Sequence, residues 1–215
     1  KNVPFTGIGF NLYDDGKLHS ENEIIEGVTE GSFRIYHKNG KIQFEGIKSK
    51  NNVLIGDSIA YHENGQKYIE GTSDEKGKKT GPYKVYFNNG QIKTEGTYKD
   101  DRKIGIQKEY YKSGKKCNEI NFIDGKANGL YKHYYESGEK MLEVTILNDK
   151  VVPISEMLGG IVTTTTINAL PIKYYSKNGI SCRIEDFKLS SKDEYFHVLL
   201  FLEKYTNFDA TDSAK

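Results

Sequence analysis

Carboxylates, imidazoles and thiols are the side chains in this sequence that could carry out chemistry, and their spacing argues against a shared site. A glutamate recurs every 24 or 25 residues, at Glu21, Glu45, Glu70, Glu95, Glu119 and Glu143. In an antiparallel sheet with two strands per repeat, equivalent positions of neighbouring repeats lie ~10 Å apart. Two carboxylates at that distance cannot share a proton in general acid/base catalysis, so the glutamates are expected to have a structural role.

The histidines and cysteines follow the same repeat. His37 and His62 occupy equivalent positions of successive units, so their spacing of ~10 Å prevents them from binding one metal ion together. Cys117 and Cys182 each stand three residues after a glycine, with one full repeat between them. Four strand spacings amount to ~19 Å, whereas a disulfide needs Cα atoms within ~7 Å. We therefore expect two free thiols.

Sequence signatures of known catalytic sites are missing. The chain has no nucleophile elbow, no phosphate-binding glycine loop, no Cys-x-x-Cys pair and no His-Glu-x-x-His motif. We expect no enzymatic activity, no cofactor and no bound metal.

The glutamates belong to a longer repeat that predicts the architecture. Each unit has a glycine, a large apolar residue five positions later, a second glycine at nine and the glutamate at fourteen. The six sets are Gly7, Leu12, Gly16, Glu21; Gly31, Tyr36, Gly40, Glu45; Gly56, Tyr61, Gly65, Glu70; Gly81, Tyr86, Gly90, Glu95; Gly105, Tyr110, Gly114, Glu119; and Gly129, Tyr134, Gly138, Glu143. Self-similarity at such a period is typical of proteins in which each unit packs only on its neighbours.

Each unit is predicted to form a β-hairpin. The segment SFRIYH runs into Asn39-Gly40 and returns as IQFEGIK, and Asn-Gly pairs favour two-residue type I′ turns. A second turn signal follows each hairpin, as in Asp100-Asp101 and Asp124-Gly125. Two turns per period predict an all-β fold, an elongated single-layer antiparallel meander of stacked hairpins. With 36% hydrophobic residues and no tryptophan, a single thick core is not expected.

Counting outward from two-residue turns also predicts which residues face each other. Four glutamates fall opposite a basic residue, in the pairs Glu45–Arg34, Glu95–Lys84, Glu119–Lys108 and Glu143–Lys132, while Glu70 falls opposite Ile59 and Glu21 opposite Phe10. Cross-strand ion pairs contribute ~0.2 to 1 kcal/mol each. The glutamates are therefore expected to fix the register of the hairpins.

The predicted organisation has three parts. Residues 7–150 hold the six repeats, and residues 151–190 form an irregular insertion and a degenerate seventh repeat around Tyr175 and Gly179. Residues 191–206 begin with a capping box and show helical spacing of apolar residues, which predicts a C-terminal capping helix.

Charge and hydropathy limit the class of partner. The 31 Lys and Arg residues nearly balance the 30 Asp and Glu residues and are interleaved with them, which argues against nucleic acid. No apolar run reaches the ~20 residues of a membrane-spanning helix, so an integral membrane protein is not expected. The chain starts at Lys1 without Met, which favours a secreted, periplasmic or surface-associated location over the cytoplasm.

The segments GPYKVYFNNGQIKTEGTY, GIQKEYYKSG and GLYKHYYESG resemble the MORN repeat variant of bacterial proteins. The resemblance covers residues 7–150, most clearly 31–150, and the repeats depart from the pattern at Leu12, Ser58 and Ile59. It implies a sheet of stacked hairpins that acts as a scaffold or binding surface. Related proteins are associated with phospholipid or protein partners, and some carry an antitoxin label.

The expected function is a non-enzymatic scaffold that presents its sheet to a protein partner. A surface for lipid headgroups or glycans is the alternative, and the resemblance adds an antitoxin-like partner of a toxin. The candidate partner-binding face combines tyrosines and lysines of the middle repeats, namely Tyr61, Tyr68, Lys84, Tyr86, Lys93, Lys108 and Tyr110.

Overall fold

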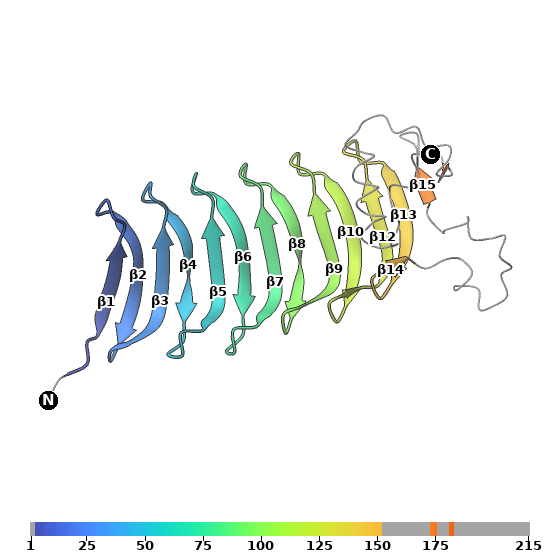
Figure 1. Ribbon diagram of the computed structural model, residues 1–215. Helices are drawn as coiled ribbons and strands as arrows, with labels where there is room; N and C mark the ends of the chain where they lie inside the picture. The colour runs from blue at the N-terminus through green and yellow to red at the C-terminus, as the bar shows by residue number, and fades with distance from the viewer. Residues whose placement is uncertain (1–2, 152–172, 176–180, 183–215) are drawn as a thin grey trace, which may run out of the picture. The chain divides into compact units, whose positions relative to one another are not determined.

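The computed structural model describes residues 3–151, 173–175 and 181–182, and the regular structure within these ranges is β-strand throughout (Figure 1). The chain divides into two compact units, residues 1–114 and 115–215, which are described separately. The predicted helix at 191–206 and most of the predicted insertion lie outside the described residues.

Unit 1 is an antiparallel meander, as the repeat predicts. Each strand pairs with the next one in the chain (Figure 1). The strands are β1 (Gly7–Leu12), β2 (Leu18–Ile25), β3 (Val28–Tyr36), β4 (Ile42–Lys48), β5 (Leu54–Tyr61), β6 (Lys67–Ser73), β7 (Lys79–Tyr86), β8 (Ile92–Lys99) and β9 (Arg102–Tyr110).

Unit 2 continues the same pattern within its own residues. Its strands are β10 (Lys116–Ile123), β11 (Lys126–Ala127), β12 (Gly129–Tyr134), β13 (Lys140–Leu147), β14 (Lys150–Val151), β15 (Lys173–Tyr175) and β16 (Ser181–Cys182). The order across the sheet is β10-β12-β13-β15-β16, with β11 beside β10 and β14 beside β13. Cys117 and Cys182 are therefore four strand steps apart, as expected, and Cys117 is a free thiol. A free thiol at Cys182 stays a prediction.

The hairpin tips differ from the predicted two-residue type I′ turns. At the β3–β4 tip, the His37 N–H donates to the Lys41 carbonyl and the Gly40 N–H donates to the His37 carbonyl. Gly40 alone in this tip has a positive φ, 82°. The tip is therefore a type I turn followed by a left-handed glycine. Asn39 favours it, because its side-chain oxygen accepts a hydrogen bond from the Lys41 N–H at 3.0 Å.

The predicted register is nevertheless confirmed for the pairs within each unit. Arg34 faces Glu45, Lys84 faces Glu95 and Lys132 faces Glu143, while Ile59 faces Glu70 and Phe10 faces Glu21. The tip has three residues instead of two, which shifts the pairing of the two strands by one residue. A β-bulge beside the tip, such as that between Ile35 and Tyr36, shifts the pairing back to the predicted register. The predicted pair of Lys108 and Glu119 has one residue in each unit, so it stays a prediction.

Type I′ turns occur at the other ends of the strands, away from the hairpin tips. Asp100 and Asp101 have φ of 50° and 66°, and the pairs at 26–27, 124–125 and 148–149 also have two positive φ values. These turns join consecutive hairpins, where the sequence predicted only an unspecified turn.

The first glycine of the repeat forms a bulge at each joint between hairpins. Between β4 and β5, Glu45 faces Ile59 and Ile47 faces Ile55, so residues 56–58 lie opposite the single residue Gly46. Gly56 opens this bulge with φ of 64°, a left-handed conformation that favours glycine. The second strand of the pair has two extra residues in this bulge, and the first glycine provides the backbone conformation that the bulge needs.

Replacing Gly56 tests this geometry. A Cβ built at Gly56 meets nothing within 4 Å, so only backbone strain opposes a side chain. We expect Gly56→Ala to lower the free energy of unfolding by ~1–2 kcal/mol, and Gly56→Asn to cost less because asparagine tolerates this region. Chemical denaturation of both variants measures the difference. Equal losses would contradict a strain-based origin.

Burial is slight in unit 1 and concentrated in unit 2. In unit 1 the buried side chains are Ser20, Tyr83 and Gln107. In unit 2, Met141, Leu142, Val144 and Ile146 of β13 are each at most 1% exposed. Over the described residues of unit 1, stability must therefore come largely from hydrogen bonds and contacts between neighbouring strands.

Candidate functional site

Five of the seven predicted partner-binding residues lie on one face of unit 1. Strand side chains alternate between the two faces, so residues in step with the repeat glutamates share their face. The exceptions are Tyr68 and Lys93, which lie in β-bulges beside two hairpin tips, where the alternation is interrupted. The face of the glutamates is called the tyrosine face and is defined by Tyr61, Lys84, Tyr86, Lys108 and Tyr110. The opposite face, which carries Phe33, Phe44, Ala60, Ile69, Tyr83 and Tyr98, is called the groove face.

The tyrosines of the tyrosine face are fixed by hydrogen bonds to the preceding hairpin. The Tyr61 hydroxyl donates to Glu45 at 2.6 Å, Tyr86 donates to Glu70, and Tyr110 donates to Glu95 at 2.6 Å. Tyr36 and Glu21 form the same contact at 2.6 Å. Each bond crosses a joint between hairpins beside the glycine bulge, so it fastens the sheet where the backbone ladder is interrupted.

These bonds are the main functional detail that the sequence analysis missed. The spacing predicts a basic partner across the hairpin for four of the six glutamates, whereas the tyrosine that Glu21, Glu45, Glu70 or Glu95 contacts belongs to the following hairpin. The sequence contains a spacing that predicts these bonds, because each glutamate precedes the tyrosine that it binds by 15 or 16 residues. Finding these pairs requires counting residues across the joint between hairpins as well as across the hairpin tip.

Ion pairs add to the same row of contacts. Arg34 lies between two glutamates, 3.1 Å from Glu21 and 3.5 Å from Glu45. Lys67 pairs with Glu70 at 2.6 Å, and Lys108 pairs with Glu95 at 3.5 Å. All of these side chains are partly exposed, so each pair contributes at most ~1 kcal/mol.

The contacts shift the ionisation of both partners. The Tyr36 hydroxyl, followed by Arg34, holds the pKa of Glu21 below its ordinary value, and Tyr110 does the same for Glu95. Lys67, followed by Tyr86, lowers the pKa of Glu70. Burial, followed by the bond to glutamate, raises the pKa of Tyr61 and of Tyr86 to about 12. The face therefore combines ionised glutamates with protonated tyrosines at neutral pH.

Stability should consequently fall at both ends of the pH scale. The lowered glutamate pKa values stabilise the fold above the ordinary value of 4.5, and this contribution is lost as the pH falls through the folded-state values. The raised tyrosine pKa values stabilise it below 10.0, and this contribution is lost as the pH rises toward about 12. We expect the double variant Tyr61→Phe, Tyr86→Phe to show a weaker alkaline loss in urea denaturation. An unchanged alkaline profile would contradict this assignment.

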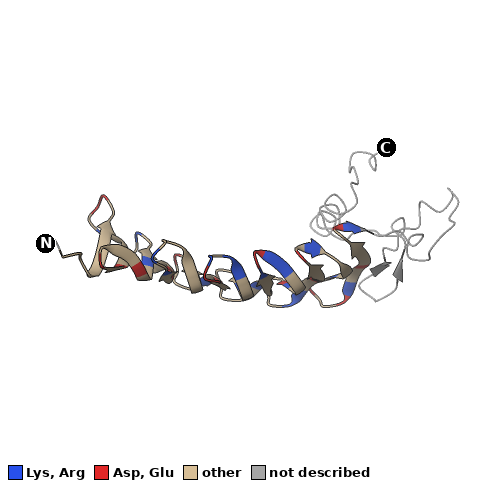
Figure 2. Cartoon of the chain, turned by 90° about the horizontal axis from the view of Figure 1, so that it is seen from below, with Lys and Arg blue, Asp and Glu red and all other residues tan. Residues whose placement is uncertain are grey.

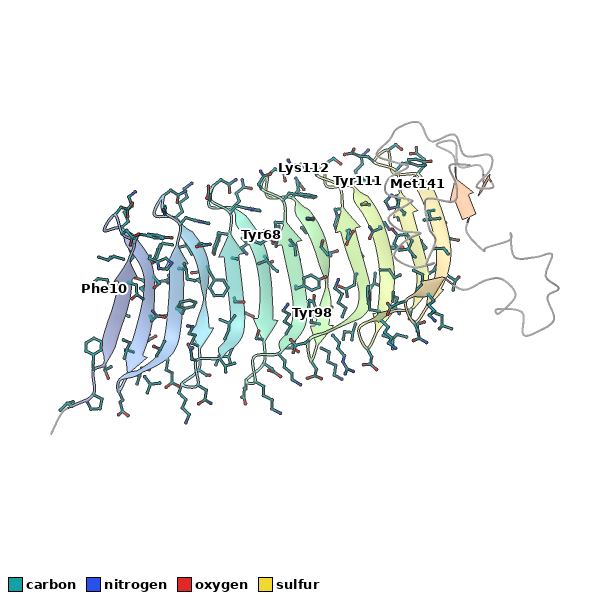
Figure 3. All side chains as sticks on the ribbon, in the orientation of Figure 1. Phe10, Tyr68, Tyr98, Tyr111, Lys112 and Met141 are labelled. Atoms are coloured by element: carbon teal, nitrogen blue, oxygen red, sulfur yellow. The ribbon has the colours of Figure 1, made fainter. Side chains whose placement is uncertain are left out.

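Tyr68 is the most exposed of the predicted tyrosines, at 48%, and lies on β6 (Figure 3). Its ring centroid lies 5.0 Å from that of His62. Lys93 lies over the Phe87 ring at 5.9 Å. Tyr68 and Lys93 occupy equivalent positions of two hairpins, and each contacts a ring at the start of its hairpin tip.

The hairpin tips are tied together in the same way. Asn39 donates to the Glu63 carbonyl at 2.8 Å, Asn64 donates to that of Asn88 at 2.8 Å, and Asn89 donates to that of Lys112 at 3.0 Å. His37 and His62 each have Nε2 near the carbonyl of the next repeat's tyrosine, at 3.1 and 3.2 Å. The histidines are thus part of the connection between tips.

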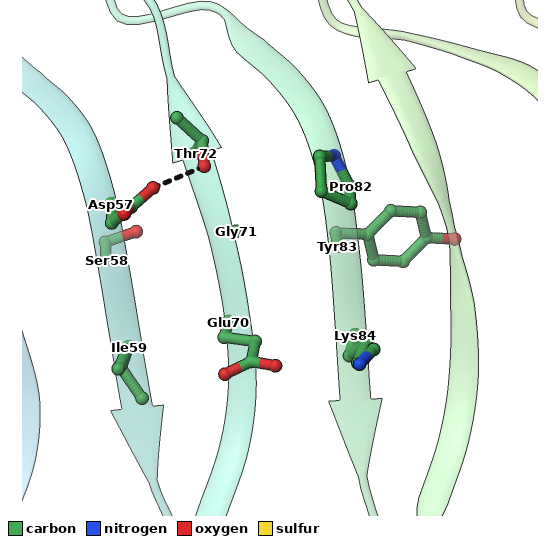
Figure 4. A pocket seen from close by; sticks show the side chains of 9 residues that line it. All are labelled: Asp57, Ser58, Ile59, Glu70, Gly71, Thr72, Pro82, Tyr83 and Lys84. Carbon is green, nitrogen blue, oxygen red and sulfur yellow. Dashed lines mark hydrogen bonds between the residues drawn. The ribbon is translucent and has the colours of Figure 1, made fainter.

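Two hollows lie near the centre of unit 1. The smaller, about 280 Å³, lies at the β6–β7 joint, where Asp57 accepts a hydrogen bond from Thr72 (Figure 4). The larger, about 470 Å³, lies on the groove face between β4 and β9. Its lining is described below with the inference that it supports.

Within the described ranges, no three His, Cys, Asp or Glu side chains are grouped as a metal site would require. The same residues contain no helix long and apolar enough to cross a membrane.

The repeats match a known family. The model of the MORN repeat variant matches residues 29–51, 79–100, 103–124 and 127–148. The chain carries MORN-variant repeats. No curated protein matches the chain.

The unmatched MORN-like units are those in which the sequence departs from the pattern. They are the first hairpin, with Leu12 in place of tyrosine, and the third, with Ser58 and Ile59. Both still form hairpins with the same register as their neighbours. The MORN-variant geometry therefore depends on the glycines and the tip more than on these side chains.

Proposed function

We propose that the protein is a non-enzymatic MORN-variant scaffold whose tyrosine face binds a protein partner. The observation that carries this proposal is the row of hydrogen bonds that holds Tyr61, Tyr86 and Tyr110 in place. A surface of aromatic side chains that are already ordered loses little conformational entropy on binding. The partly exposed side chains of Lys67 and Lys108 supply further contacts.

A protein partner is favoured over a lipid surface by the charges. Anionic membranes attract clusters of Lys and Arg. On the tyrosine face, lysines alternate with glutamates, as at Lys67–Glu70 and Lys108–Glu95, and Figure 2 shows both signs along the strands. Alternating charges suit a partner with a complementary pattern of its own.

Neighbouring residues on β6 provide a matched test. Lys67 lies on the tyrosine face, where it pairs with Glu70, and its side chain is 46% exposed, whereas Ile69 lies on the groove face and is 38% exposed. A photo-crosslinking amino acid at position 67 should capture a defined protein in the source cells, and the same group at position 69 should not. Equal capture at both positions would contradict a partner specific to the tyrosine face.

Charge neutralisation separates the partner classes. Lys84→Gln with Lys108→Gln should reduce capture at position 67 and leave the fold intact by circular dichroism. The same protein is tested on vesicles of phosphatidylserine and on a glycan array. Lipid or glycan binding that the double variant abolishes, with no protein captured, would replace the proposed partner class.

A further inference from the structure

The groove face of unit 1 contains a hollow that arises from one departure from the repeat. Two residues after the first glycine, neighbouring units carry a ring, Phe33 in one and Tyr83 in another, whereas the unit between them carries Ser58. Ser58 faces Gly71, and Ala60 faces Ile69. Small side chains therefore form the floor of the hollow. The volume of the whole hollow is about 470 Å³.

Aromatic side chains form the two walls. On one side Phe44 packs against Phe33, with ring centroids 5.8 Å apart. On the other, Tyr83 packs against Tyr98 at 4.7 Å, and its ring points away from Gly71 toward the next strand (Figure 4). Because the Tyr83 ring points toward the next strand, it does not cover the floor at Gly71 (Figure 4).

The apolar character of the floor is set by Ile69, Val85 and Leu54, which line the hollow. Ile69 is 38% exposed even though it lies on the same face as the buried Tyr83. A volume of this size is within the range of sites that bind small organic molecules, which is ~300–1,000 Å³. The walls and floor therefore suit a compact apolar body.

Two lysines and two glutamates line the hollow, and they lie at different places around it. The Glu70 carboxylate is bound on the tyrosine face by Lys67 and Tyr86. Lys79 and Lys103 line the side where β7 and β9 begin, and the Lys79 ammonium lies 5.5 Å from the centre of the Tyr98 ring. Glu109 lines the far side, beside Thr94. A ligand with one negative group would place it near the two lysines and away from Glu109.

We propose that this hollow binds a small amphiphilic anion, an aromatic or short aliphatic body that carries one acidic group. The apolar body lies over Ser58, Ala60 and Gly71 between the two aromatic walls. The acidic group lies against Lys79 and Lys103. This site is on the face opposite the proposed partner surface, and it does not depend on that proposal.

The fluorescent probe 8-anilinonaphthalene-1-sulfonate tests the site, because it joins aromatic rings to one sulfonate. Ser58→Phe restores the ring that Phe33 and Tyr83 provide in their units, and it should weaken probe binding at least about tenfold. Ala60→Leu fills the same floor and should act likewise if Ser58→Phe folds poorly. Unchanged binding in both folded variants would overturn the proposal.

The role of the lysines is tested by competition of decanoate and decanol against the probe. The double variant Lys79→Gln, Lys103→Gln should weaken competition by decanoate about tenfold and leave that by decanol unchanged. The matched control on the tyrosine face, Lys84→Gln with Lys108→Gln, should change neither. Equal weakening for the acid and the alcohol, or an effect of the control, would exclude the proposed orientation.

Discussion

Tyr86→Ala is expected to lower the free energy of unfolding by ~2–4 kcal/mol, as for buried aromatic deletions discounted for partial exposure. The ring packs between hairpins, and the hydroxyl donates to Glu70 across the β6–β7 joint. Tyr86→Phe keeps the ring and removes only this hydrogen bond. It should lower the free energy of unfolding by ~1 kcal/mol, which is a small loss for a hydrogen bond to a charged group. The loss is small because Lys67 still pairs with Glu70. Chemical denaturation of both variants separates the two contributions.

Tyr68→Ala is the matched control, because Tyr68 is half exposed and lies on β6, the strand that pairs with the strand of Tyr86. It should change stability by less than ~0.5 kcal/mol. If Tyr86→Ala also changed stability by less than this and instead abolished partner capture, Tyr86 would belong to the binding surface and the structural role would be wrong. Tyr110→Ala should follow Tyr86→Ala, since its bond to Glu95 is equivalent.

The sequence predicted the meander because its two turn signals per period are local and strong. Turn residues and strand alternation act over a few positions, so Asn39-Gly40 and Asp100-Asp101 locate the two edges of the sheet. The turn types were partly wrong, since Asn39 uses its side chain to form a type I tip. The register was right because a bulge compensates for the longer tip, and neither feature alone is visible in the residue pattern.

The candidate site was harder to predict for a physical reason. The Tyr–Glu bonds depend on how one hairpin meets the next, and that geometry is set by the bulge at Gly56 and its equivalents. Counting along a hairpin does not reach across such a joint. The hollow at Ser58 likewise depends on the direction of two aromatic pairs, which no spacing rule determines.

The glycine that follows the glutamate shows how closely the groove face is packed. A Cβ at Gly96 would overlap the Gln107 amide. That amide is 4% exposed and donates to Ile104 at 2.9 Å and Thr97 at 3.3 Å, so it cannot move without losing hydrogen bonds. We therefore expect Gly96→Ala to cost ~1–3 kcal/mol by overpacking.

Gly71 provides the control for this substitution, since a Cβ there lies at an ordinary 3.5 Å from the Tyr83 Cβ. Gly71→Ala should cost less than half as much as Gly96→Ala. Gln107→Ser removes the amide that a methyl at position 96 would meet, so Gly96→Ala should be nearly neutral when introduced into Gln107→Ser. A double-mutant cycle by chemical denaturation measures this coupling. Additive losses would show that contact with Gln107 is not the reason that this position requires glycine.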